Sequence, residues 1–361
     1  MGAALALRGD LEGAQGLAAP DLRGGPRRGK IDAMRSGRAA VALVTIALLA
    51  LAAAGPAAAK RAWEPPLQVP RAQLEAAFHC HGTIAPGGPQ PLLFVTGTGA
   101  TGEQGWLIGH GAFEALGHPV CDVDFPDYTT ADIQVSVQYL VWAIRREHQM
   151  AGRKIAIFGI SQGGLLPRFA LTYWPGLRPL VSDVVAAAGT QHGTTAGAGG
   201  CSEATPCPPA YWQQAAGSNL LRALNRQPVE APGPTAWTTV RSTTDEAVQP
   251  TTGPHPTSAL KGAANIVIQA ICPGRVTTHI GTATDSVSFA AFADAISHPG
   301  PAKPSRFPAD VCAHPYAPGL DEATTSAFLA GTASPLATQE AGVPRVGAEP
   351  KVRAYVKRLV R

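Results

Sequence analysis

The stretch IAIFGISQGG, residues 155–164, contains a Gly-x-Ser-x-Gly motif with Ser161 at its centre. The apolar residues before the serine predict a short strand buried on both faces, as in a parallel sheet. The residues after it, GGLLPRFALTYW at 163–174, predict a helix, with Pro167 near its first turn, where a missing N–H costs least. A strand, a sharp turn at a serine and a helix would hold that hydroxyl at the edge of a sheet.

Strand-like apolar runs alternate with helical segments over the rest of the chain. Within residues 130–150, apolar positions recur at helical spacing from Ile133 to Ile144. Such alternation predicts an α/β fold, a single domain with a mostly parallel central sheet flanked by helices. The Gly/Pro/Ala-rich residues from about 190 to 235 are expected to form a loop or a cap. Strands are predicted at 91–97, 120–125, 154–159, 180–189, 236–242 and 264–271.

A serine hydroxyl is a weak nucleophile until a base removes its proton. When the serine sits on such a turn, an acid is expected next along the chain and a histidine last. Asp245 follows the strand-like AWTTVRS, and His279 follows the strand-like ANIVIQAI and a short loop. We therefore expect Ser161, Asp245 and His279 to form a catalytic triad. Other downstream candidates lie within a strand, in proline-rich loops or out of order: His192, His255, His314, Asp183, Asp285, Asp294 and Asp321.

An oxyanion would need two hydrogen-bond donors near Ser161. Gln162 opens a helix whose first N–H groups lack partners, and Thr98 follows a strand with both an N–H and a hydroxyl. The same loop, GTGATG at 97–102, also matches a dinucleotide-binding motif, with Asp122 or Asp124 placed for the ribose. The glycine-rich continuation GEQGWLIGHG and an export signal near the N-terminus argue against this oxidoreductase alternative.

The N-terminal leader, residues 1–59, carries most of the charge imbalance. Residues 1–59 hold seven of the 29 Lys/Arg and four of the 25 Asp/Glu, so the remainder carries 22 basic and 21 acidic residues. This near neutrality, without a polybasic tract, argues against a nucleic-acid partner.

A positive segment, MRSGR, precedes the apolar run AAVALVTIALLALAAAG and the small residues AAA. This pattern predicts a secretory signal peptide over residues 34–59 and a secreted catalytic domain over residues 60–361. A membrane-spanning helix is the alternative, because the run is about long enough to span. The small residues and Pro56 at the end of the run favour cleavage. Residues 1–33 are expected to be an unstructured extension upstream of the true start.

Six cysteines fit an oxidising compartment and disulfide bonds. Cys201 and Cys207 flank a short loop and could pair with each other. HCH at 79–81 looks like a set of metal ligands, but neighbouring strand residues point to opposite faces. These three side chains could not converge on one ion, so we expect Cys80 to be a disulfide partner and expect no metal site.

Together, these features resemble the Candida antarctica lipase B-like family of the α/β-hydrolase superfamily. The resemblance runs in unbroken order from about residue 80 to 315 and is far more specific than any single motif. It implies a serine esterase that acts on lipid esters through an acyl-enzyme and needs no cofactor. The matching stretches are LLFVTGTGATG, DIQVSVQYLVWAI, SQGGLLPRFALTYWPGLR, YWQQAAGSNLLRAL, TTDEAVQP and QAICPGRVTTH.

The resemblance also implies roles for individual residues. The family's nucleophile, acid and base fall on Ser161, Asp245 and His279, and its oxyanion donors fall on Thr98 and Gln162. Its cystine pattern implies the pairs Cys80–Cys121 and Cys272–Cys312, with Cys201–Cys207 as a local addition.

The implied substrate pocket departs from the family. Ile160 stands where the family has a tryptophan in the floor of the alcohol pocket, and Thr190 stands where it has an acidic residue on the acyl side. Gln214 is expected to line the same pocket. These departures predict a roomier and less stereoselective alcohol pocket.

The sequence therefore predicts a secreted, monomeric serine lipase or carboxylesterase that acts on triacylglycerol-type esters and contacts a lipid interface transiently. The alternatives are an esterase for soluble or polymeric esters and a non-catalytic binding protein on the same fold. The basic segment KVRAYVKRLVR, residues 351–361, is expected to be a solvated terminal helix, with contact to an anionic surface as the alternative.

Overall fold

The computed structural model describes residues 63–106, 110–196, 200–328 and 341–358. They belong to one unit, Arg61–Arg361, whereas a second unit, Met1–Lys60, lies outside the described residues. The predicted signal peptide and N-terminal extension therefore also lie outside them. Within the described ranges, no helix is both long enough and apolar enough to cross a membrane.

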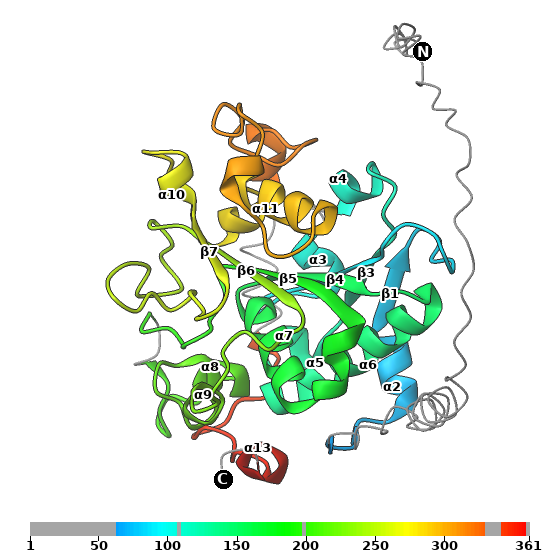
Figure 1. The fold of residues 1–361 in the computed structure, drawn as a ribbon. Coiled ribbons are helices and arrows are strands. Elements are labelled where there is room, and N and C mark those ends of the chain that lie inside the picture. Colours follow the sequence, from blue (N-terminus) through cyan, green and yellow to red (C-terminus); the bar gives the residue numbers. More distant parts are fainter. Residues whose placement is uncertain (1–62, 107–109, 197–199, 329–340, 359–361) are drawn as a thin grey trace, which may run out of the picture. The chain divides into compact units, whose positions relative to one another are not determined.

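A seven-stranded sheet runs through the centre of the unit (Figure 1). Its strand order is β1-β3-β2-β4-β5-β6-β7; β1 pairs antiparallel with β3, and every other neighbouring pair is parallel. The sheet confirms the predicted α/β architecture. The strands are β1 (Phe78–His81), β2 (Leu92–Val95), β3 (Val120–Val123), β4 (Ile155–Ile160), β5 (Val181–Ala187), β6 (Ala236–Arg241) and β7 (Ala264–Val267).

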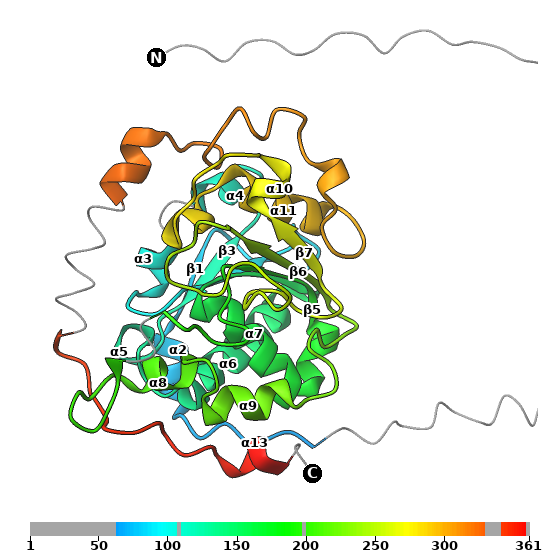
Figure 2. The same ribbon diagram turned by 90° about the vertical axis from the view of Figure 1, so that its left-hand side faces the viewer.

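Helices lie on both faces of this sheet, as the two views in Figures 1 and 2 show. The α-helices are α2 (Arg71–Ala76), α3 (Gly102–Trp106), α4 (His110–Glu114), α5 (Pro126–Thr129), α6 (Ile133–Ala151), α7 (Gln162–Tyr173), α8 (Pro209–Gln214), α9 (Asn219–Asn225), α10 (Ile268–Ile271), α11 (Ser286–Ser297) and α13 (Ala354–Arg358). The 3-10 helices are η1 (Pro175–Leu180), η3 (Ile280–Ala283) and η4 (Pro304–Arg306).

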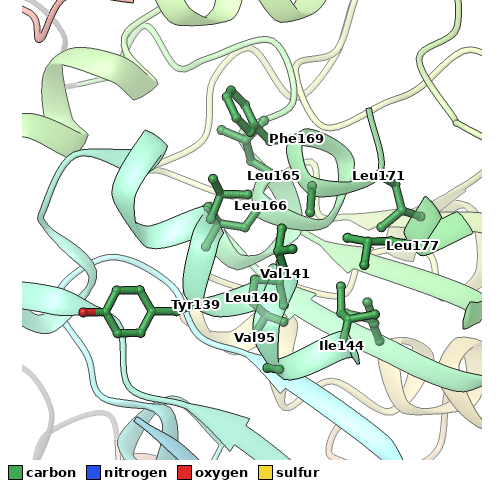
Figure 3. Close-up of a cluster of buried hydrophobic side chains, with 14 of the residues drawn as sticks. Val95, Tyr139, Leu140, Val141, Ile144, Leu165, Leu166, Phe169, Leu171 and Leu177 are labelled. Carbon is green, nitrogen blue, oxygen red and sulfur yellow. The ribbon is translucent and has the colours of Figure 1, made fainter. Parts of the chain in front are cut away.

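Alternate residues of β2 face two separate hydrophobic clusters. Leu93 and Val95 belong to the cluster formed with α6 and α7, part of which Figure 3 shows. Leu92 and Phe94 belong to a second cluster, formed with α11 on the opposite face. Because both faces of the central strands are buried, their sequences are continuously apolar rather than alternating.

The structure differs from the sequence prediction in three places. The run at 264–271 is a strand only as far as Val267 and continues as α10. Pro167 is the sixth residue of α7, inside the helix rather than in its first turn. Its missing N–H therefore leaves the carbonyl of Gly163 without the usual helical donor. The region from 190 to 235 contains the short helices α8 and α9.

Candidate active site

Ser161 occupies the turn between β4 and α7, at the carboxyl edge of the sheet. Its φ of 58° and ψ of −123° lie in a region that residues other than glycine rarely adopt. The residue is partly exposed, whereas all of β4 and α7 on either side are buried. The turn therefore holds the hydroxyl out of the core, and the unfavourable backbone conformation of Ser161 costs about 1–3 kcal/mol.

The two glycines of the motif allow the strand and the helix to approach each other. A Cβ atom on Gly159 would lie 2.0 Å from the carbonyl oxygen of Gly163. A Cβ atom on Gly163 would lie 2.0 Å from the carbonyl oxygen of Val95 in β2. Both contacts are with backbone atoms, so any larger residue would displace the strand or the helix and disturb the turn at Ser161.

Asp245 and His279 form a buried hydrogen-bonded pair at the same edge of the sheet. Asp245 follows β6, and its Oδ2 accepts a hydrogen bond of 2.9 Å from Nδ1 of His279. Its Oδ1 accepts two further bonds of 2.9 Å, from the N–H groups of Ala247 and Val248. The side chain of Asp245 is 2% exposed and that of His279 is 12% exposed. The carboxylate is thus fixed in place, and it leaves Nε2 of the imidazole as the nitrogen available to a substrate or a nucleophile.

Neighbours of this pair join the two loops that carry it. The Thr244 hydroxyl donates to the carbonyl of Thr277 at 3.0 Å and accepts from the Thr277 N–H at 2.9 Å. The Glu246 carboxylate accepts the N–H of His279 at 3.0 Å. The sequence prediction missed these residues, although both loops show paired threonines, in RSTTDE and RVTTH. Three successive residues of one loop therefore bind the other.

A buried ion pair supports the histidine loop from behind. Arg275 lies 3.2 Å from Oδ1 of Asp285, and the Thr277 hydroxyl donates to Oδ2 of Asp285 at 3.0 Å. Arg275 also donates to the carbonyl of Cys312 at 2.8 Å. Burial raises the pKa of Asp285 above its usual value, although the hydrogen bonds from Arg275 and Thr277 partly oppose this increase. Because Arg275 and Thr277 both precede His279, the pair restrains the backbone that positions the imidazole.

The structure brings the histidine loop next to β4. The helix η3 begins immediately after His279 and packs against β4, the strand that ends one residue before Ser161. Within the described residues, no hydrogen bond joins the Ser161 hydroxyl to the imidazole. Such bonds are often long in unliganded enzymes and shorten when substrate binds.

A polar cluster includes Gln162, the residue that follows Ser161. The Thr98 hydroxyl donates to Oε1 of Gln162 at 2.8 Å. Nε2 of Gln214 donates to both of these oxygens, at 2.8 Å each, and the Thr190 hydroxyl donates to Oε1 of Gln214 at 3.1 Å. The cluster therefore links four predicted site residues: Thr98, Gln162, Thr190 and Gln214.

Two of these residues could bind an oxyanion at Ser161. Gln162 is the first residue of α7, so its backbone N–H has no acceptor within the helix. The hydroxyl of Thr98 is directed at the Gln162 side chain here, so it would have to turn its hydrogen to reach an oxyanion. The Gln214 donor holds the hydroxyl oxygen in place during that rotation.

Ile160, the remaining predicted pocket residue, is not part of the polar cluster. Its side chain is 7% exposed and packs in the hydrophobic cluster on the α11 face, with Phe158 and Ala187. An apolar side chain therefore directly precedes Ser161, between the turn and the core.

The aspartates considered for a dinucleotide site make contacts at the sheet edge. Oδ1 of Asp124 accepts the N–H of Gly102 at 2.8 Å, and Oδ2 of Asp122 lies 3.2 Å from Nε2 of His81. Burial raises the pKa of Asp122 from 3.8 to about 6, against the lowering effect of His81. Both carboxylates are held by contacts within the fold, which gives no support to the oxidoreductase alternative.

In the described part of the chain, no group of three or more His, Cys, Asp or Glu residues is placed to hold a metal ion.

All six cysteines are paired in the structure. The disulfides are the three that the sequence and the resemblance suggest, Cys80–Cys121, Cys201–Cys207 and Cys272–Cys312. They fit a protein of an oxidising, extracellular compartment.

The chain is similar in sequence and structure to known lipases. It is 33% identical to lipase B of Pseudozyma (Candida) antarctica over 235 residues, which cover 63% of this chain and 67% of that protein. It is also similar to the crystal structure of Aspergillus fumigatus lipase B, with a TM-score of 0.74 and 29% identity over 84% of this chain and 75% of that chain. No family profile matches the sequence. The chain therefore belongs to the Candida antarctica lipase B-like family of α/β-hydrolases and is a carboxylic ester hydrolase that acts on lipid esters.

Proposed function

We propose that the protein is a secreted serine lipase that hydrolyses triacylglycerol-type esters through a triad of Ser161, His279 and Asp245. The hydrogen bond between Asp245 and His279, just before a helix that packs against β4, is the observation that carries this proposal. The strained backbone of Ser161 supports it, because such strain persists where the surrounding structure maintains it for function.

In the proposed reaction, Nε2 of His279 removes the proton of Ser161 as the serine oxygen attacks the ester carbonyl carbon. The resulting tetrahedral intermediate collapses when the imidazolium returns this proton to the leaving alcohol oxygen, and an acyl-enzyme remains. Water, deprotonated by the same imidazole, then attacks the acyl carbon, and the proton returns to Ser161 as the free acid leaves. Asp245 holds the tautomer with Nδ1 protonated and stabilises the imidazolium.

The proposed oxyanion donors are the backbone N–H of Gln162 and the N–H and hydroxyl of Thr98. One well-placed donor of this kind is typically worth about 10²–10³ in rate. Gln214 and Thr190 are proposed to line the acyl side of the pocket, where the hydrogen bond between them fixes both side chains. Ile160 is proposed to form the floor of the alcohol pocket.

We further propose that residues 34–59 are a cleaved signal peptide, preceded by an unstructured extension over 1–33, and that 60–361 form a monomeric catalytic domain. Transient contact with a lipid interface is supported by two apolar side chains near His279 in the sequence. Val276 is 78% exposed and Ile280 is 37% exposed.

A fluorophosphonate probe and a series of p-nitrophenyl esters test the proposed triad. Ser161→Ala should abolish both labelling and hydrolysis, whereas Ser305→Ala, at an exposed serine of η4, should change neither. Turnover by Ser161→Ala equal to that of the wild type would remove Ser161 from its proposed role. A comparison of short-chain esters, long-chain emulsions and polyesters would distinguish a lipase from an esterase for soluble or polymeric substrates.

A further inference from the structure

A basic groove lies between α9 and the C-terminal segment. Figures 1 and 2 both show α9 next to α13, on the side of the unit away from α11. The groove has a volume of about 510 Å³. Four of its lining residues are exposed cations, namely Arg222 and Arg226 from α9, Lys351 from the segment before α13, and Lys357 from α13.

Among the described residues, these four cations have no carboxylate partner. Within the described ranges, none of them forms a salt bridge, and Arg222 donates only to the neutral amide of Asn219. Other arginines of the fold do form ion pairs, namely Arg71–Glu75, Arg145–Glu64, Arg275–Asp285, Arg306–Asp294 and Arg353–Asp132. The groove therefore concentrates positive charge that the fold does not neutralise locally.

One acidic residue, Glu349, is among the described residues that line the groove, and its carboxylate is already hydrogen-bonded. Oε2 of Glu349 accepts the backbone N–H and the side-chain amide of Asn219, at 2.8 Å each, and Oε1 accepts the N–H of Leu220 at 2.9 Å. This carboxylate binds the first turn of α9, so it does not pair with the four cations around it.

An exposed tryptophan adjoins the same segment. Trp63 is 46% exposed, and the guanidinium of Arg358 stacks 4.3 Å from the centre of its ring. Trp63 lines a second hollow of about 430 Å³, whose wall includes Arg353 and Tyr355 from the C-terminal segment. An amphipathic indole beside several cations is a combination found where proteins contact the headgroup region of a bilayer.

We propose that the groove cations, together with Arg358 and Trp63, form a docking surface for the anionic headgroups of a lipid bilayer. Four cations from α9 and from the C-terminal segment line the groove, whereas a single free phosphate would need only two or three donors at one point. Trp63 gives this surface an apolar anchor, which a soluble anion or a nucleic-acid backbone would not require. The sequence alone favours a solvated terminal helix over 351–361; the convergence with α9 appears only in the folded chain.

Vesicle binding by the Ser161→Ala protein tests this proposal, and because binding rather than hydrolysis is measured, its outcome can be separated from a failure of the catalytic assignment. We expect binding to vesicles of phosphatidylcholine mixed with phosphatidylglycerol, weaker binding to phosphatidylcholine alone, and loss of binding as NaCl is raised. Each cation near an anionic surface contributes roughly a fivefold factor in partitioning. Arg226→Gln with Lys357→Gln should therefore weaken binding by about 25-fold.

The matched control is Arg146→Gln with Arg153→Gln, which removes the same charge from exposed positions outside the groove. This control should bind nearly as well as its parent. Equal losses in the two double variants, or equal binding to neutral and anionic vesicles, would overturn the proposal. Displacement of the protein by inorganic phosphate at low millimolar concentration, or tighter binding to an oligonucleotide than to the vesicles, would also overturn it. If the groove variant does not fold, Arg222→Gln with Lys351→Gln serves in its place.

Discussion

Nδ1 of His279 lies 2.9 Å from Oδ2 of Asp245, and the other oxygen of this carboxylate is held by two backbone N–H groups. The two residues follow different strands, and Thr244 and Glu246 on either side of Asp245 bind Thr277 and His279. The aspartate therefore has one orientation, and this orientation fixes the position and the tautomer of the imidazole.

Asp245→Asn should lower kcat by about 10⁴ with little change in folding, because the amide can still accept the two backbone bonds but favours the wrong imidazole tautomer. Ester hydrolysis and thermal unfolding of the purified variant measure the two effects. Glu246→Gln is the matched control: its amide oxygen can still accept the His279 N–H, so most activity should remain. Loss of less than about tenfold in Asp245→Asn would show that the pair is structural rather than catalytic.

Thr98→Val should lower kcat by about 10²–10³ while KM changes little, because the hydroxyl is expected to serve the transition state rather than the bound ester. Thr98→Ser keeps a hydroxyl in the same place and should retain most activity. Thr98→Val also removes the oxygen that accepts one hydrogen bond from Gln214, so the thermal unfolding of this variant should be measured together with its kinetics. An unchanged kcat in Thr98→Val would leave the backbone N–H groups as the oxyanion donors.

Ile160→Trp should increase the enantioselectivity for bulky secondary alcohols by narrowing the proposed alcohol pocket. Ile160 is buried, so the larger ring is expected to destabilise the fold by about 1–3 kcal/mol through overpacking. Ile160→Leu, with nearly the same volume, is the control and should leave selectivity unchanged. If wild type and Ile160→Trp resolve the two enantiomers equally well, Ile160 does not shape the alcohol pocket.

Local sequence patterns predicted the central fold because the strands are buried on both faces. The apolar runs of β2, β4 and β5 are each nearly continuous, and the helical spacing in α6 marks the side that packs on the sheet. The edge strand β1 was not among the predicted strands, since it has only four residues. Its sequence FHCH does alternate apolar and polar positions, as a half-buried strand would, and the absence of a metal site at 79–81 was inferred from this geometry. The strand at β7 was predicted too long because apolar residues continue into α10.

The candidate site was predicted in a similarly uneven way. The order of Ser161, Asp245 and His279 along the chain follows from the turn motif, so these positions could be named from the sequence. The two hydrogen bonds between Thr244 and Thr277 join loops that meet only in the folded chain, and no periodic sequence pattern indicates them. The groove cations, likewise, come from segments more than a hundred residues apart in the sequence.

Glu147 lies within α6 and is fully buried, with neither carboxylate oxygen hydrogen-bonded in the described part of the chain. Burial raises the pKa of this carboxyl well above 4.5, so the folded protein keeps a proton that the unfolded chain releases. The contribution of Glu147 to stability is therefore most favourable at low pH and decreases as the pH rises above the pKa of this carboxyl in the unfolded chain.

Glu147→Gln cannot ionise, so its stability relative to wild type should rise with pH, with a gain of about 1–3 kcal/mol near neutral pH. Urea unfolding at several pH values measures this trend, and the exposed Glu114→Gln should show no such dependence. A stability difference between Glu147→Gln and wild type that stays constant across the acidic to neutral range would mean that Glu147 does not retain its proton in the fold.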